Sequence, residues 1–275
     1  MKKILVPIDF SKPSEYAAKM AAMIAKKTSA TVYLIHLIEL PSGIVDMGFN
    51  SRFSVPESML YLRKTREKIL EFKKSFFSED ITVEYFIKIN NPFEGIKKYA
   101  EKIDADLIIM GSKGHSEFDE IIIGSNTEKV VRTSKIPVIA VKRDRKKFKL
   151  NNLVFASNFK NENKKVFSKF LEFANAFDSE IHLLKINTPS DFESTQSAEE
   201  SLKNFIKGYH LPKHTMHIYN DISVEKGIIN FSKDKEVDLI ALGTHGRSGL
   251  SHLFTASVTK NLSKTALKPM FTVKV

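Results

Sequence analysis

The chain has 275 residues, of which 42% are hydrophobic and 27% are charged, a globular rather than disordered balance with room for one large or two ordinary domains. It contains no cysteine, which excludes disulfides, thiol catalysis and cysteine-based zinc sites. The formal net charge is +11, but the lysines are scattered along predicted helices, so we favour solvated helix faces over a surface for nucleic acid.

In chain order, short β-branched apolar runs alternate with amphipathic runs. The first half predicts strands at 3–8, 31–38, 82–88, 106–110 and 137–142, and helices at 13–27, 57–76, 92–102 and 126–134. The segment 41–58 is rich in Gly, Pro and Ser and is expected to be a loop. Nearly continuous apolar strands that alternate with helices are typical of a doubly wound α/β sheet with both faces covered.

The second half repeats the first. ADLIIMGSKGHSEF (105–118) returns as VDLIALGTHGRSGL (237–250), and KKILVPIDFS (2–11) returns as NNLVFASNFK (151–160). Strands are predicted at 152–157, 180–186, 214–219, 238–242 and 269–274, and helices at 162–177, 196–207, 223–234 and 256–264. We therefore expect two α/β domains, at 1–145 and 150–275, joined by a basic linker.

Each half ends in an apolar strand, 137–142 in the first and 269–274 in the second. Exposed apolar strand edges invite pairing. We expect these two strands to lie side by side across a pseudo-twofold axis, so that the two domains form an internal pseudo-dimer.

Three glycines, Gly111, Gly114 and Gly124, lie between a predicted strand and a predicted helix in MGSKGHSEFDEIIIGSN (110–126). Glycine lets the backbone turn tightly and lets a ligand come close, and a helix N-terminus offers free N–H groups to phosphate. The pattern G-x2-G-x9-G-S could thus cradle phosphate without a Walker lysine. Alternatively, the glycines only shape the turn, and Ser125 with Glu128 forms a capping box. Neither the P-loop nor the dinucleotide fingerprint occurs in the chain.

This glycine pattern, VPIDFS at the first strand and the Pro-Val type of final strand resemble the universal stress protein family over essentially the whole chain. The likeness is to its ATP-binding branch and its tandem members. It implies, in each half, a five-stranded parallel sheet of order 3-2-1-4-5, as in the adenine nucleotide alpha hydrolase-like folds. It also implies ATP as ligand, with a divalent cation such as Mg²⁺ or Mn²⁺, a role in stress resistance and regulation, and dimerisation through the final strand. A homodimer of the whole chain is a further expectation.

The resemblance assigns the ligand contacts of the first half by position. Asp9 matches a residue that contacts adenine or ribose, and Leu37 a residue whose backbone meets adenine. The ribose and phosphate contacts match Met110, Gly111, Gly114, Gly124, Ser125 and Asn126. The structural alternatives are that Asp9 caps the first helix and that Leu37 is an ordinary core residue.

Two departures from the family pattern bear on this assignment. In the first half, the carboxylates Glu117, Asp119 and Glu120 follow the second glycine and would repel a triphosphate. In the second half, Asn158 stands in place of the aspartate and Ala256 in place of the third glycine. We therefore expect the second half to be impaired, and one nucleotide to bind per chain, in the first half.

The leading hypothesis is a stress-response regulatory protein that binds ATP in its first domain and has no catalytic residues or metal ligands of its own. One alternative is an ATP-hydrolysing enzyme of the same fold group, and another is a basic nucleic-acid-binding protein. His210 and His214 could approach one another and hold a metal ion, but they lack an acidic partner. No apolar run approaches the roughly 18 residues that span a bilayer, so we expect a cytoplasmic protein without membrane contact.

Overall fold

The structure is a computed structural model that describes residues 1–39, 55–112, 124–143, 148–211, 213–244 and 268–275. The side chains of residues 55–58 are likewise not described. Gly114, the helix predicted at 256–264 and residues 41–54 of the loop predicted at 41–58 lie outside the described residues. The loop prediction is wrong for residues 55–58, which belong to a helix.

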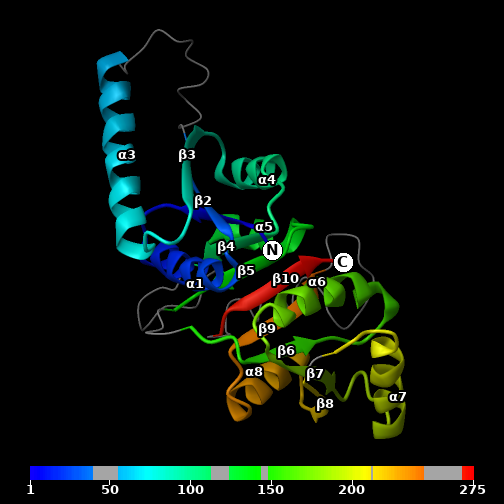
Figure 1. Cartoon of the computed structure of the whole chain (residues 1–275). Helices are drawn as coiled ribbons and strands as arrows, with labels where there is room; N and C mark the ends of the chain where they lie inside the picture. Colours follow the sequence, from blue (N-terminus) through cyan, green and yellow to red (C-terminus); the bar gives the residue numbers. More distant parts are fainter. Residues whose placement is uncertain (40–54, 113–123, 144–147, 212, 245–267) are drawn as a thin grey trace.

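The first half contains five strands and four described helices that alternate along the chain (Figure 1). They are β1 (Lys3–Ile8), α1 (Lys12–Thr28), β2 (Thr31–Ile38), α3 (Val55–Phe76), β3 (Val83–Ile89), α4 (Pro92–Lys102), β4 (Leu107–Gly111), α5 (Ser125–Thr133) and β5 (Val138–Val141). Helix α3 begins two residues before its predicted start. Pro56 lies in its first turn, where the missing N–H of proline is tolerated.

The second half repeats this alternation. Its elements are β6 (Asn152–Ala156), a 3₁₀ turn (Asn161–Asn163), α6 (Lys164–Asn175), β7 (Glu180–Asn187), α7 (Thr195–Ile206), β8 (His214–Asn220), α8 (Val224–Asp234), β9 (Leu239–Thr244) and β10 (Met270–Lys274). The predicted helix at 162–177 is thus divided into a 3₁₀ turn and the shorter helix α6.

The described strands form one sheet in the order β3-β2-β1-β4-β5-β10-β9-β6-β7-β8. Strands within each half are parallel, and each half has the predicted order 3-2-1-4-5. Strands β5 and β10 pair antiparallel, with Ile139 opposite Phe271. The prediction that the two final strands lie side by side is confirmed.

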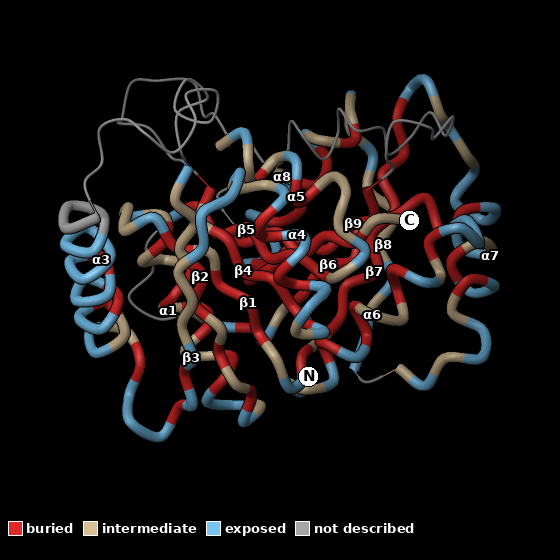
Figure 2. The backbone as a smooth tube through the Cα atoms, turned by 90° about the horizontal axis from the view of Figure 1, so that it is seen from above, coloured by how far each residue is buried: buried red, intermediate tan, exposed pale blue. Residues whose placement is uncertain are grey.

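Helices cover both faces of the sheet. On one face, α1, α3, α6 and α7 bury their apolar side chains in a single cluster that runs through both halves. On the other face, α4 and α5 cover the first half and α8 covers the second. Viewed from above, the central strands are buried while α3 and α7 lie at opposite ends of the molecule with exposed surfaces (Figure 2).

Three left-handed backbone positions recur at corresponding points of the two halves. The first follows β1 and β6, the second follows α1 and α6, and the third follows α4 and α8. The pairs are Phe10 and Phe159 (φ 61° and 56°), Ser29 and Asp178 (both 54°), and Asp104 and Glu236 (both 48°). Such φ values are uncommon for residues other than glycine. Their recurrence shows that the two halves repeat each other in turn geometry as well as in sequence.

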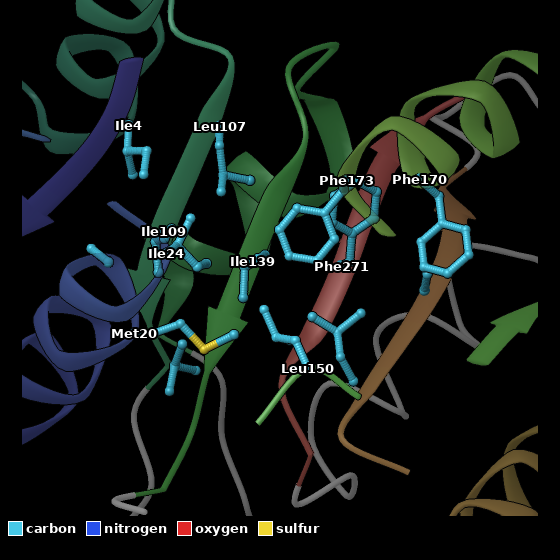
Figure 3. Close-up of a cluster of buried hydrophobic side chains, with 14 of the residues drawn as sticks. Ile4, Met20, Ile24, Leu107, Ile109, Ile139, Leu150, Phe170, Phe173 and Phe271 are labelled. Carbon is cyan, nitrogen blue, oxygen red and sulfur yellow. The ribbon is translucent and has the colours of Figure 1, made fainter. Parts of the chain in front are cut away.

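Aromatic side chains of the second half pack where the two halves meet. Phe271 of β10 is 1% exposed, and its ring centroid lies 5.9 Å from that of Phe170 and 5.2 Å from that of Phe173, both on α6. Ile139 of β5 and Leu150 of the connecting segment belong to the same cluster (Figure 3). The seam between the two sheets is therefore part of the core and not a solvated domain boundary.

Truncating the ring at this seam should destabilise the whole chain. We expect Phe271→Ala to lower the free energy of unfolding by about 3–5 kcal/mol, because it removes buried contacts and leaves a cavity. Urea denaturation followed by circular dichroism measures the change. Phe192, which is 76% exposed, provides the control, and Phe192→Ala should change stability by less than about 0.5 kcal/mol. Similar losses in the two variants would contradict a buried seam.

Candidate functional site

A cleft of about 320 Å³ lies at the carboxyl ends of β1, β2 and β4, which is where ligands bind in doubly wound sheets. We call it the first-half cleft. Seven of the eight predicted site residues line it, namely Asp9, Leu37, Met110, Gly111, Gly124, Ser125 and Asn126. The eighth, Gly114, lies outside the described residues, as do Glu117, Asp119 and Glu120.

Asp9 is held in place by the turn that joins β1 to α1. Its Oδ1 accepts hydrogen bonds from the backbone N–H of Ser11, at 3.0 Å, and from the Ser11 hydroxyl. Ser11 in turn caps α1, because its side chain accepts a hydrogen bond from the N–H of Ser14. The N-cap is thus Ser11, so the alternative that Asp9 caps the helix is wrong; Asp9 instead holds the capping serine. The side chain is nevertheless exposed and lines the cleft, so the carboxylate can also act as an acceptor for a ligand.

The structure explains why residue 111 is a glycine, in a way that the sequence did not suggest. A Cβ atom at this position would lie 2.3 Å from both the backbone carbon and the oxygen of Pro13, at the start of α1. Gly111 does not have a positive φ. The absence of a side chain is thus required first for α1 to pack against the end of β4, and the first helix turn thereby reaches the rim of the cleft.

The N-terminus of α5 forms the wall next to β4. The helix begins at Ser125 with Gly124 as its N-cap, and no side chain caps it. The alternative of a capping box that starts at Ser125 is therefore wrong. The hydroxyl of Thr127 donates to the carbonyl oxygen of Gly111, at 3.0 Å, and ties the helix to the strand. Within the described part of the chain, the N–H groups of Ser125 and Asn126 have no acceptor, so they can bind an anion.

The opposite wall of the cleft is apolar. Leu37 of β2 is half-buried, and α4 approaches it so closely that a Cβ on Gly95 would lie 2.7 Å from a Leu37 methyl carbon. Pro92 and Ile96 of α4 also line this side. Leu37 is thus both a packing residue for α4 and a surface of the cleft, so its two predicted roles are compatible.

Sequence reasoning missed several lining residues, including Thr127, Pro92 and Ile96. Thr127 directly follows the glycine motif and could have been found as the next residue of the helix N-terminus. Pro92 and Ile96 belong to a helix that the sequence predicts but does not place over the end of β2. Only the strand order, which seats the β3–β4 crossover on this face, brings them to the cleft.

The sheet order arranges these groups in a line across the cleft. Apolar side chains of β2 and α4 come first, the carboxylate of Asp9 at the end of β1 is next, and the open N-terminus of α5 beyond β4 is last. A ligand with a flat apolar part, a hydroxylated middle and an anionic end would meet matching groups in this order.

The corresponding position in the second half is closed. Asn158, the counterpart of Asp9, is 6% exposed, and its Oδ1 accepts from the N–H of Lys160 at 3.1 Å and from Nδ2 of Asn163 at 2.9 Å. A Cβ on Gly243 would lie 2.6 Å from Oδ1 of Asn163. The Asn163 side chain therefore fills the space between α6 and the end of β9. Ala256 and its neighbours lie outside the described residues.

The loop that follows β7 is fixed over the second half. Lys185 is 4% exposed and forms an ion pair with Glu193 at 2.6 Å. The side chain of Asn187 donates to the carbonyl oxygen of Glu193, at 2.8 Å, and accepts from its N–H, at 3.1 Å. Ile186, the counterpart of Leu37, is 6% exposed and packs against α8. Among the described residues, the counterparts of Asp9 and Leu37 are thus buried in the second half.

A repeated five-stranded unit with a ligand-sized cleft at its topological switch point defines a tandem α/β protein of the doubly wound class. The sequence profile of the Universal stress protein family matches residues 1–142 and again residues 149–274. The chain belongs to this family and contains two copies of its domain, so it is related to a family of stress-response proteins.

Individual relatives match either one half or the whole chain. Universal stress protein MJ0577 from Methanocaldococcus jannaschii is 35% identical over 156 residues, which is 52% of this chain and 95% of that protein. Universal stress protein MJ0531 from the same organism is 32% identical over 145 residues, or 53% of this chain and 84% of that protein. The crystal structure of a universal stress protein from Archaeoglobus fulgidus aligns with a TM-score of 0.73 over 99% of this chain and 98% of that one, at 20% identity. It shows that the tandem fold is shared.

A minor hypothesis from the sequence is a metal ion held by His210 and His214. The described residues contain no group of three histidine, aspartate or glutamate side chains able to hold a metal ion. Instead, His217 of β8 lies beside His182 of β7, with 3.3 Å between Nε2 and Nδ1, and the Thr215 hydroxyl contacts both nitrogens at 2.8 Å.

No helix among the described residues is long and apolar enough to span a bilayer.

Burial beneath α8 lowers the pKa of both histidines, and that of His217 falls to about 4. Lys213 and Lys235 lower the pKa of His182 further, whereas Glu180 opposes the shift; His182 and Lys235 act in the same direction on His217. Both rings are therefore neutral in the folded chain at neutral pH. An unfolded histidine has a pKa of about 6.5, so below that value the unfolded state binds more protons than the folded state.

The histidine pair should accordingly make the protein sensitive to acid between about pH 6.5 and 4. We expect the parent to lose roughly 1–2 kcal/mol more stability between pH 7 and pH 4.5 than His217→Gln, which cannot titrate. Urea titrations at the two pH values measure this difference. The prediction fails if His217→Gln and the parent lose the same stability on acidification.

Proposed function

We propose that this member of the universal stress protein family is a stress-response regulatory protein that binds ATP in the first-half cleft. The observation that carries the proposal is the order of groups along the cleft: an apolar wall, then a carboxylate, then an uncapped helix N-terminus. The family resemblance implies ATP independently of this geometry, and the two lines of argument agree on the same residues.

The residues present fit an adenine nucleotide. The apolar surface of Leu37, Pro92 and Ile96 would take the flat adenine ring. Asp9 would accept hydrogen bonds from ribose hydroxyls, since an ionised carboxylate is an acceptor only. The N–H groups at the start of α5 would face the phosphates, where the helix dipole favours negative charge. A volume of about 320 Å³ is at the lower end of the range for ligand clefts.

A divalent cation such as Mg²⁺ or Mn²⁺ would enter this site with the nucleotide. The described residues provide no cluster of three acidic or histidine side chains, so the phosphate oxygens would supply most of its ligands. The cation would also offset repulsion between the phosphates and nearby carboxylates.

The differences between the halves support one nucleotide per chain. Asp9 is exposed and charged, whereas Asn158 is buried and engaged with Asn163 and Lys160. For a ligand to reach Asn158, it would have to displace these internal hydrogen bonds. Exchange of a charged acceptor for a neutral one alone weakens a hydrogen bond by roughly 1 kcal/mol.

Removing the Asp9 carboxylate from the cleft should weaken the binding of ATP without unfolding the protein. We expect a stoichiometry of one for the parent, and about ten- to a hundredfold weaker binding for Asp9→Ala, because a charge-assisted hydrogen bond is worth about 1.5–3 kcal/mol. Titration calorimetry with ATP and Mg²⁺ measures both. Asp80, an exposed aspartate in the same half, provides the control, and Asp80→Ala should bind like the parent. A stoichiometry of two, or undiminished binding by Asp9→Ala, would overturn the assignment.

The proposed role of the α5 N-terminus in phosphate binding can be tested by adding a single methyl group at Gly124. Gly124 has φ −57° and ψ 135°, which an alanine adopts without strain, so Gly124→Ala should keep the fold. We expect the substitution to weaken the binding of ATP about tenfold, because the added Cβ would intrude on the space of the phosphates at the N-cap. Thr133→Ala, at the other end of α5, should leave binding unchanged. If Gly124→Ala folds and binds ATP as tightly as the parent, the phosphates do not lie at this helix.

A further inference from the structure

A second concave site lies between α4 and α5, farther along these helices than the first-half cleft. This groove has a volume of about 390 Å³. Its floor is apolar and consists of buried residues from three elements, namely Ala100 of α4, Ile108 of β4 and Val130 of α5. Phe93 of α4 also lines the groove.

The groove is built from both halves of the chain. Lys274, the last residue of β10, belongs to the second half and lines a groove whose helices belong to the first. Its backbone N–H donates to the carbonyl oxygen of Ser134, at 3.0 Å, directly after α5. The pairing of β5 with β10 therefore fixes Lys274 relative to α5, and neither half alone contains the complete groove.

Three lysines from three elements surround this apolar floor. Lys97 lies on α4, Lys135 follows α5 and Lys274 ends β10, whereas Glu101 is the one carboxylate among the lining residues. Within the described part of the chain, none of the three ammonium groups forms an ion pair. Three lysines against one glutamate leave an excess of positive charge along the groove, and such a surface attracts anions.

We propose that this groove is a second ligand site, which binds a small organic anion with a flat or apolar body. The apolar floor would remove the body of the ligand from water, and the lysines at the rim would hold its carboxylate, sulfonate or phosphate group. The site differs from the first-half cleft in its polar groups, because its charge comes from lysine side chains and not from a helix N-terminus. It therefore stands independently of ATP binding.

The aromatic sulfonate 1-anilinonaphthalene-8-sulfonate is a suitable probe, since it combines an apolar body with one anionic group and fluoresces when it leaves water. Titration of the parent should show saturable binding. Lys97→Glu/Lys135→Glu should weaken it at least tenfold, and Thr133→Trp, which fills the groove from α5, should abolish it. Both lysines are exposed, so the charge variant should fold.

A matched control separates the groove from the overall charge of the protein. Lys98→Glu/Lys102→Glu makes the same charge change on exposed residues of α4 that do not line the groove, and it should bind the probe within about twofold of the parent. Equal weakening in the two double variants would show a non-specific charge effect and overturn the proposal. Absence of saturable binding in the parent, or binding that survives both Lys97→Glu/Lys135→Glu and Thr133→Trp, would overturn it too.

Discussion

The antiparallel pairing of β5 with β10 is the interaction on which the rest of the molecule depends. It joins two five-stranded sheets into one and turns two apolar edges into the middle of a core that contains Ile139 and Phe271. It also seats α5 against the second half, where the hydroxyl of Thr244 donates to the carbonyl oxygen of Val131 at 3.3 Å. The same nine-residue helix thus begins at the first-half cleft, passes the groove and ends at the seam. Its position is set at both ends by hydrogen bonds, to Gly111 and to the second half.

The two halves share one backbone arrangement, but side chains at equivalent positions have different roles. The recurring left-handed turns place Asp9 and Asn158 at the same point of the fold, directly before Phe10 and Phe159. In the first half, the side chain faces an open cleft; in the second, it is sealed by Asn163. The buried amide of Asn158 carries no charge to desolvate, and its Oδ1 accepts two hydrogen bonds, although its Nδ2 has no partner among the described residues. Asparagine therefore suits a position whose side chain is packed inside the second half.

The sequence was sufficient for the fold because its signals are local and repeated. Apolar strands, amphipathic helices and the copied segments predict the bounds of the described elements to within a few residues, and the family resemblance supplies the strand order. The site was harder to predict from the sequence, because its residues come together only after folding. Gly111 is glycine because a side chain would collide with Pro13, which is distant in sequence. The sequence allows Ser125 as a helix cap, although Gly124 holds that position. Pro92 reaches the cleft only through the β3–β4 crossover that contains α4. The contact between His182 and His217 likewise depends on the register of β7 with β8.

Joining both domains in one chain has a consequence for how such a protein can vary. In a dimer of identical subunits, every substitution appears twice, so a change that closes one pocket closes both. Here the partner of β5 is part of the same molecule, and its effective concentration does not fall on dilution. Each domain can then acquire its own substitutions while the shared sheet is kept. The exchange of the exposed Asp9 for the buried Asn158 at equivalent positions is an example of that freedom: one side chain stays accessible, and the other has become part of the packing of its domain.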